Sequence, residues 1–191
     1  MPKIKISPLS VIYIFVLIKA KTPHLPALAL AIVLHELGHL FCAKLLKIKI
    51  KGLNLSILGA RIEARGDISY TDEFLLASSG PFVNLLSFAI ACPFSNTNSQ
   101  LLPFATVSLC LAIFNLLPLS TLDGGRILKC LAFRIFTFGI ALKIQSVVSF
   151  FTLFFLWLIS VYTMLKISAG LSMLVFCSFF FAKCFILDNK K

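Results

Sequence analysis

The stretch His35-Glu36-Leu37-Gly38-His39 lies in the middle of an apolar segment, with residues 27–34 before it and 40–43 after it. Two histidines four residues apart lie on one face of a helix, one turn from each other. That spacing lets both imidazoles bind one zinc ion, while the glutamate between them is free to act as a general base. Histidine and glutamate are costly inside hydrocarbon, so this group predicts a metal-dependent active site at membrane depth.

The composition is that of an integral membrane protein. The 191 residues are 59% hydrophobic and 13% charged, whereas a soluble domain is about 45–50% apolar and about 25% charged. The formal charge of +11 is attributed to basic residues in cytoplasmic loops that meet anionic lipid, so we expect the bilayer and no nucleic acid as a partner. The 6 cysteines form no CxxC motif and are interpreted as small buried hydrophobes.

The hydropathy predicts an all-α polytopic membrane protein with about six transmembrane helices, in a single domain over residues 1–191. The expected spans are about 7–20, 25–46, 73–93, 101–122, 144–165 and 168–187, with a catalytic core over about 25–125 and C-terminal helices over about 144–187. With the N-terminus inside, fifteen Lys and Arg fall on the inner side and three on the outer side, so both termini should face the cytoplasm.

Two segments between spans have patterns of their own. Over residues 48–66 apolar and polar residues alternate, which predicts a membrane-associated β-hairpin after the second span. Gly52 shifts the alternation as a bulge would, and Gly59-Ala60 is the expected turn. The alternative is an irregular basic loop. Residues 124–143 mix basic with apolar side chains and suggest an interfacial helix.

A zinc site of two histidines needs a third protein ligand, because catalytic zinc takes three and a water. Of the 7 acidic residues, Glu36 alone lies deep in a span, and Asp123 ends an apolar run before Gly124-Gly125. We therefore predict that His35, His39 and Asp123 bind Zn²⁺ and that Glu36 is catalytic. The alternatives are helix-packing histidines and an aspartate in a helix-end turn. His24 is interpreted as an ordinary loop histidine.

Three motifs, in order, resemble the site-2 protease family of intramembrane zinc metalloproteases. His35–His39 matches the family's HExxH, Gly80-Pro-Phe-Val-Asn84 its GPxxN, and residues 115–125 its NxxP followed by LDGG. The resemblance suggests Asn84 and Asn115 as polar groups near the site that contact the substrate or the oxyanion. The alternative for both is interhelical hydrogen bonding, because a buried amide needs partners.

The layout of six spans with short loops and no PDZ insert is most similar to the bacterial stage IV sporulation protein FB branch. That resemblance implies regulated intramembrane proteolysis of a membrane-tethered pro-sigma factor, and small membrane proteins as inhibitors. It also implies a bacterial cell membrane or the membrane around the forespore as the location. A CBS domain commonly follows the sixth span in that branch, and none is expected here. The oligomeric state is left open.

We therefore expect a zinc metalloendopeptidase that cleaves a membrane-associated protein within or near the bilayer. Pro81, Pro118 and nearby glycines interrupt regular helix near the expected site, as irregular backbone lining a wet cavity does. The hairpin is expected to pair with an unwound substrate as an added strand. Two alternatives are a metal-binding transporter and a catalytically silent scaffold. The fifth and sixth spans lack an ionisable pair for a transport path, and the intact Glu36 disfavours a scaffold.

Overall fold

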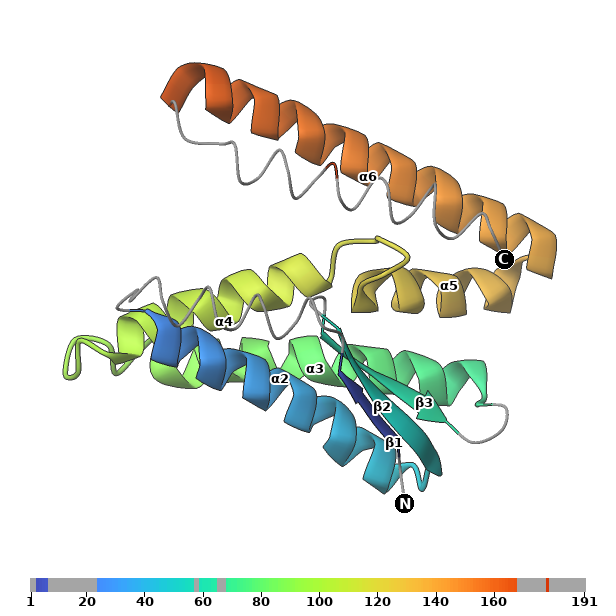
Figure 1. Cartoon of the computed structure of the whole chain (residues 1–191), viewed down its shortest axis with the longest axis horizontal. Helices are drawn as coiled ribbons and strands as arrows, with labels where there is room; N and C mark the ends of the chain where they lie inside the picture. Colours follow the sequence, from blue (N-terminus) through green and yellow to red (C-terminus); the bar gives the residue numbers. More distant parts are fainter. Residues whose placement is uncertain (1–2, 7–23, 57–58, 65–67, 168–177, 179–191) are drawn as a thin grey trace. The chain divides into compact units, whose positions relative to one another are not determined.

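The structure is a computed structural model that describes residues 3–6, 24–56, 59–64, 68–167 and 178. The chain divides into two compact units, Met1–Leu116 and Leu117–Lys191, and each is described by itself. Figure 1 shows the helices and strands along the chain.

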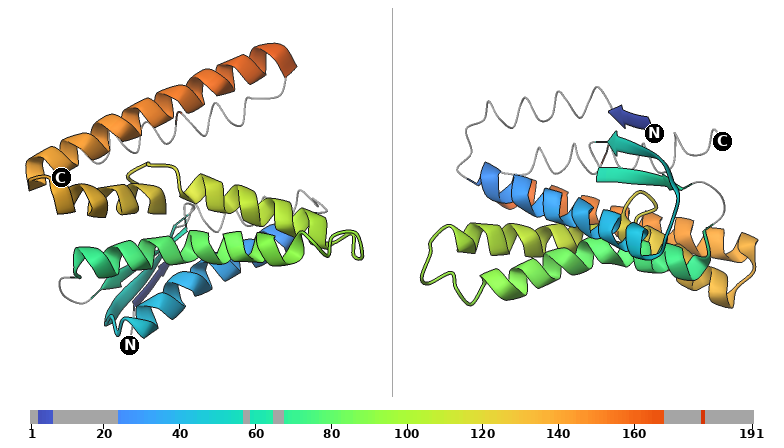
Figure 2. Two further views of the ribbon diagram at one scale, coloured as in Figure 1. Left: turned by 180° about the vertical axis from the view of Figure 1, so that it is seen from behind. Right: turned by 90° about the horizontal axis from the view of Figure 1, so that it is seen from below.

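Three helices form the body of the first unit: α2 (Leu25–Leu45), α3 (Tyr70–Ala91) and α4 (Leu101–Asn115). Each contacts the other two, and Figure 2 shows them side by side. A proline in its first turn suits the start of α2, where the missing N–H costs nothing. At the start of α3, Ser69 Oγ accepts a hydrogen bond of 3.1 Å from the backbone N–H of Asp72, which is an N-cap.

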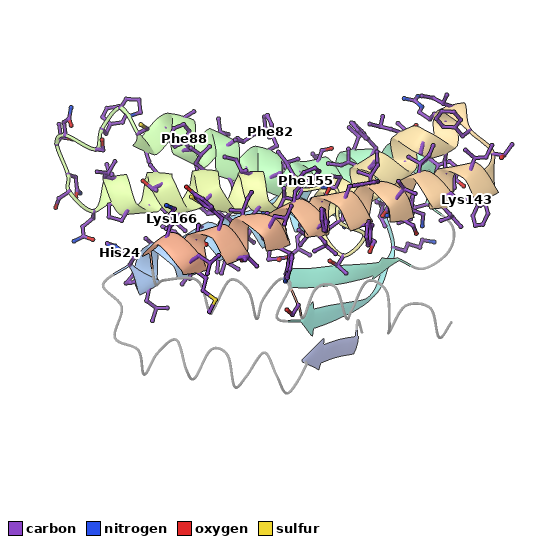
Figure 3. All side chains as sticks on the ribbon, turned by 90° about the horizontal axis from the view of Figure 1, so that it is seen from above. His24, Phe82, Phe88, Lys143, Phe155 and Lys166 are labelled. Carbon is purple, nitrogen blue, oxygen red and sulfur yellow. The ribbon has the colours of Figure 1, made fainter. Side chains whose placement is uncertain are left out.

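Most of the interior of this bundle is made of small and polar residues, with Leu76 of α3 as a buried large residue, and many other large apolar side chains are exposed. The buried residues of α2 are Ala31, His35, Gly38, His39 and Ala43, and those of α4 are Ala105, Ser108 and Ala112. Phe41 is 65% exposed, and Phe82, which is labelled in Figure 3, is 64% exposed. Small interior residues and apolar exteriors are typical of helices that pack in a membrane.

Gly38 lets α2 and α3 approach closely. A Cβ atom at this position would lie 2.8 Å from the Ser79 carbonyl oxygen and 2.9 Å from Cγ2 of Val83. The close approach brings the histidine-bearing face of α2 against α3.

A small sheet also belongs to the first unit. Its order is β1 (Lys3–Ile6), β2 (Ile50–Ser56) and β3 (Gly59–Ala64), with β1 parallel and β3 antiparallel to β2. The register between β2 and β3 shifts between Ile50 and Gly52, where the sequence predicts a bulge. The predicted turn at Gly59-Ala60 is wrong, because both residues are paired within β3, opposite Ser56 and Leu55. β1 was not expected.

The second unit contains α5 (Asp123–Ile135) and α6 (Phe138–Ile167), which contact each other. Gly125, in the first turn of α5, permits a sharp return of the chain, because a Cβ there would collide with the Leu119 carbonyl oxygen and lie 2.8 Å from the Ser120 nitrogen. The aromatic face of α6 is exposed, with Phe155 at 59% (labelled in Figure 3).

Within the described residues, α2, α3 and α6 are long and apolar enough to cross a membrane, and α4 is a shorter apolar helix. Several predicted bounds change. The helix expected over 101–122 ends at Asn115, because Pro118 disfavours helical backbone before it. The helix expected from 144 begins at Phe138, so the linking segment is shorter than predicted. The expected span at 7–20 and nearly all of that at 168–187 lie outside the described residues.

Cys42, Cys92, Cys110 and Cys130 are free thiols in the structure. Cys130 is buried, but Cys110 is exposed, so the prediction of a buried site is wrong for Cys110. On an apolar helix such as α4, an exposed thiol is compatible with lipid contact because cysteine behaves as a small hydrophobe.

Candidate metal centre

The two histidines of α2 turn their ring nitrogens toward each other. His35 and His39 are both buried, and their Nε2 atoms lie 3.2 Å apart. The rings are nearly perpendicular, at 84°. Two nitrogen ligands of tetrahedral zinc, each about 2.0–2.1 Å from the ion, lie about 3.3 Å apart. The spacing of the Nε2 pair therefore fits two corners of a zinc site.

His39 is held in the tautomer that metal binding needs. Its Nδ1 lies 2.7 Å from the carbonyl oxygen of Leu76 and 3.2 Å from Oγ of Ser79. The Ser79 hydroxyl donates its proton to the same carbonyl, at 2.7 Å, and so does not donate to Nδ1. His39 Nδ1–H is therefore the donor, and the carbonyl is the acceptor. A neutral ring with its proton on Nδ1 leaves the Nε2 lone pair for a metal.

His35 contacts α3 through Asn84. The Asn84 side chain is fully buried, and its Nδ2 lies 3.1 Å from His35 Nδ1. The resemblance to site-2 proteases suggests Asn84 as a substrate or oxyanion contact, which stays a prediction. The structure places its amide against a metal-ligand candidate.

Gly80 lies directly against both imidazoles. A Cβ at Gly80 would collide with Nε2 of His39 and lie 2.7 Å from Nε2 of His35. The absence of a side chain therefore keeps the space beside both Nε2 atoms open. Together with the donor chemistry, this open space shows that the residues present fit a bound zinc ion.

The other predicted residues of this unit lie on the same helices. Glu36 follows His35 on α2 and is half-buried. Asn115 is the last residue of α4, and its Nδ2 donates to the Leu111 carbonyl of its own helix at 3.0 Å. His24 is the exposed N-cap residue of α2 (labelled in Figure 3), eleven residues before His35.

Asp123 belongs to the second unit, where it is the first residue of α5. Its Oδ1 lies 3.4 Å from Nη1 of Arg126, one turn along the helix. Two side chains of α6 hold the segment that carries it: Gln145 Nε2 donates to the Gly125 carbonyl at 3.2 Å, and Ser149 Oγ donates to the Pro118 carbonyl at 3.0 Å.

The sequence interpretation gave no site role to Leu76 and Ser79 of the first unit, or to Gln145 and Ser149 of the second. The sequence does contain a signal for the contribution of α3. Leu76, Gly80 and Asn84 are spaced by four residues and so share one face of α3. Which face meets the histidines depends on contacts between residues 37 to 49 positions apart, and no local pattern reports these.

The fold and the histidine pair define a membrane-embedded metal-binding protein, and comparisons with known proteins agree. The model of peptidase family M50 matches residues 88–159. A candidate zinc metalloprotease of Synechocystis sp. is 31% identical over 114 residues, which cover 55% of this chain and 30% of that protein. A zinc metalloprotease of Methanocaldococcus jannaschii is 32% identical over 111 residues, which cover 54% of this chain and 32% of that protein.

Among solved structures, the site-2 protease from Methanocaldococcus jannaschii has the same fold, with a TM-score of 0.66. The alignment covers 93% of this chain and 86% of that one, at 22% identity. The family model thus matches part of this chain, and the solved structure shares its fold. The chain spans about a third of the length of the curated relatives, at 30% and 32%. Zinc is the metal in the names of both, and the donor set described above suits it.

Proposed function

We propose that this protein is an intramembrane zinc metalloendopeptidase that hydrolyses a peptide bond of a membrane-associated protein within or near the bilayer. The observation that carries this proposal is the Nε2 pair of His35 and His39, 3.2 Å apart in an apolar helix with Glu36 between them. The names of the curated relatives support the same activity.

Asp123 is the third ligand in this proposal. Catalytic zinc takes three protein ligands and keeps one position open, and a carboxylate is an accepted third donor beside two imidazoles. Asp123 opens α5 on a segment tied to α6 by Gln145 and Ser149, so its backbone is fixed within the second unit. The site-2 protease LDGG motif, which residues 122–125 match, supports the same role.

Zinc, when bound, supplies Lewis-acid polarisation of a water and of the substrate carbonyl. Glu36 accepts the proton of the attacking water and delivers it to the leaving amine. Glu36 follows His35 on α2 and is half-buried, which supports this role. His35 and His39 orient the metal, while the buried helix faces around them limit the access of bulk water. Asn84 and Asn115 stay candidates for contacts with the substrate or the oxyanion.

We further propose the finer features of the sporulation-type layout: six spans, both termini in the cytoplasm, and a membrane-tethered pro-sigma factor as substrate. The excess of Lys and Arg on the expected inner side supports this topology. The sheet of β1, β2 and β3 would bind an unwound substrate as an added strand. A reporter fused to the segment at residues 94–100 tests the topology, because that segment should lie outside.

The decisive experiment compares the wild type with Glu36→Gln by co-expression with a membrane-tethered pro-sigma substrate and by zinc analysis of both purified proteins. A protease predicts equal zinc content and cleavage by the wild type only. Metal transport that survives Glu36→Gln would instead identify a transporter. Equal biological function of both proteins without any cleavage would identify a scaffold.

A further inference from the structure

The length of α6 places the turn that joins α5 to α6 at a membrane surface. The apolar part of α6, Phe138–Lys166, has 29 residues. At about 1.5 Å per residue, a helix of this length measures about 44 Å, which is close to the thickness of about 40–45 Å of a bilayer with its headgroups. The two ends of α6 therefore reach opposite headgroup regions. Because α5 ends at Ile135 and α6 begins at Phe138, the end of α5 shares one of these regions.

Exposed basic side chains lie on both sides of this turn: Lys129 and Arg134 on α5, and Lys143 on α6. Figure 3 labels Lys143 near one end of α6 and Lys166 at the other. By the helical rise, Lys129 lies about 9 Å before the end of α5, and Lys143 lies about 7.5 Å after the start of α6. The two helices contact each other, and long basic side chains extend toward water. All three basic side chains near the turn therefore reach one headgroup region.

The charge of these three side chains is not balanced within this part of the chain. Residues 124–167 contain five Lys and Arg and no Asp or Glu. Asp123, at the start of α5, pairs with Arg126 at 3.4 Å. Among the described residues, the structure gives the three exposed basic side chains no acidic partner. Charge complementarity therefore favours an anionic partner at this surface.

Lys129 lies against aromatic side chains that reach from α5 to α6. Its Nζ is 5.6 Å from the centroid of the Phe133 ring, which is a cation–π contact. The Phe133 ring stacks on the Phe138 ring, with the centroids 5.3 Å apart and the planes 8° apart. Phe138 itself is 66% exposed. An ammonium group with three hydrogen-bond donors thus lies beside an exposed apolar surface.

A phospholipid suits this combination better than an acidic peptide does. The phosphate of a lipid accepts hydrogen bonds, and its acyl chains cover apolar side chains, whereas an acidic peptide supplies charge without hydrocarbon. Leu131 and Ile135, which are 43% and 75% exposed, add apolar surface on α5. Helices that combine basic and apolar surface bind anionic lipid at the membrane interface.

We propose that Lys129, Phe133 and Phe138 form a binding site for an anionic phospholipid. The Lys129 ammonium binds the phosphate, and the exposed ring of Phe138 contacts the acyl chains. Arg134 and Lys143 raise the positive potential around the site. The inference goes beyond the proposed function, because it concerns a lipid ligand and not the hydrolysis of a peptide bond.

Lipid binding to the full chain in an uncharged detergent tests the site. Phosphatidylglycerol and phosphatidylcholine with the same acyl chains are added separately, and native mass spectrometry measures the bound fraction. Each Lys or Arg near an anionic lipid surface strengthens binding about fivefold, so the wild type should prefer phosphatidylglycerol at least about tenfold. Lys129→Gln should bind phosphatidylglycerol about fivefold more weakly, and Lys129→Arg should retain the affinity. Lys166→Gln, the same change at the other end of α6, is the matched control and should be unchanged.

Phe138→Ser tests the apolar half of the site and should weaken the binding of both lipids. The unfolding temperature of each variant without added lipid checks that the fold is retained. Equal affinity of the wild type for the two lipids, or equal losses in Lys129→Gln and Lys166→Gln, would overturn the proposal.

Two competitors distinguish the lipid from other anions. Displacement of phosphatidylglycerol by inorganic phosphate would assign the site to free phosphate, and displacement by an oligoglutamate peptide would assign it to an acidic protein partner. Either result would overturn the proposal, which expects neither competitor to displace the lipid. No readout here involves zinc or cleavage, so failure of the lipid site would leave the metalloprotease proposal standing.

Discussion

The backbone carbonyl of Leu76 lies 2.7 Å from Nδ1 of His39, across the interface between α3 and α2. Four residues further along α3, Gly80 makes room for both imidazoles, and four further still Asn84 contacts His35. A single face of α3 therefore contacts both histidines and leaves the space beside their Nε2 atoms open. Helix α2 thus supplies the two candidate ligands, and α3 orients them.

Gly80→Ala should abolish zinc binding and cleavage. The added methyl group would occupy the space beside both Nε2 atoms and would collide with the Nε2 atom of His39. Zinc content per purified chain, measured by atomic absorption, should fall to background. Gly139→Ala is the matched control, because a Cβ there meets nothing within 4 Å. Full zinc content in Gly80→Ala would show that the helices separate more easily than their packing indicates.

Zinc should raise the thermal stability of the protein in detergent. A ligand that binds only the folded state adds about 2.7 kcal/mol at a free concentration of about one hundred times its Kd. The unfolding temperature of the wild type should therefore rise with zinc and fall again with a chelator. His35→Ala and His39→Ala should show no such rise. A rise of equal size in both variants would place the stabilising metal elsewhere.

Gln145→Leu should weaken zinc binding although residue 145 is no metal ligand. Gln145 donates to the Gly125 carbonyl, two residues after Asp123, and its loss removes a hydrogen bond between α6 and α5 that is worth about 0.5–1.5 kcal/mol. A several-fold loss of zinc affinity and of cleavage is expected. Thr152→Val, which removes a hydroxyl bonded to the backbone of its own helix, is the control. Unchanged affinity in Gln145→Leu would mean that the proposed ligand segment is held by other contacts.

The sheet order leaves β3 at an edge, where an extended substrate can add as a further strand. Successive residues of an edge strand point their N–H groups alternately toward β2 and away from it. Of the variants Arg61→Pro and Ile62→Pro, one should therefore disrupt the sheet and the other should block the edge alone. The edge-blocking variant should keep zinc and thermal stability but cleave substrate more slowly. Wild-type cleavage rates in both variants would exclude strand addition at β3.

Much of the site could be predicted from local sequence. The four-residue spacing of His35 and His39 places two imidazoles on one helix face whatever the helix packs against. The apolar segments around them predict membrane helices because length and hydropathy are properties of the chain alone. Even the irregularity at Gly52 follows from a local break in alternation, and the pairing of β2 with β3 has its register shift there.

Only the tertiary structure shows which residues contact the two histidines and which strand pairs with β2. The sequence placed Asn84 near the site through a motif, but only packing of α3 on α2 put its amide on His35 Nδ1. The sequence predicts an interruption of regular helix at Pro81 and its neighbouring glycine, but α3 continues through both, and Gly80 leaves room for two rings. The pairing of β1 with β2 joins residues 3–6 to residues 52–55, too far apart for any local pattern to predict. Spacing along the chain determines which side chains share a face, but the partner of that face is determined by contacts between distant residues.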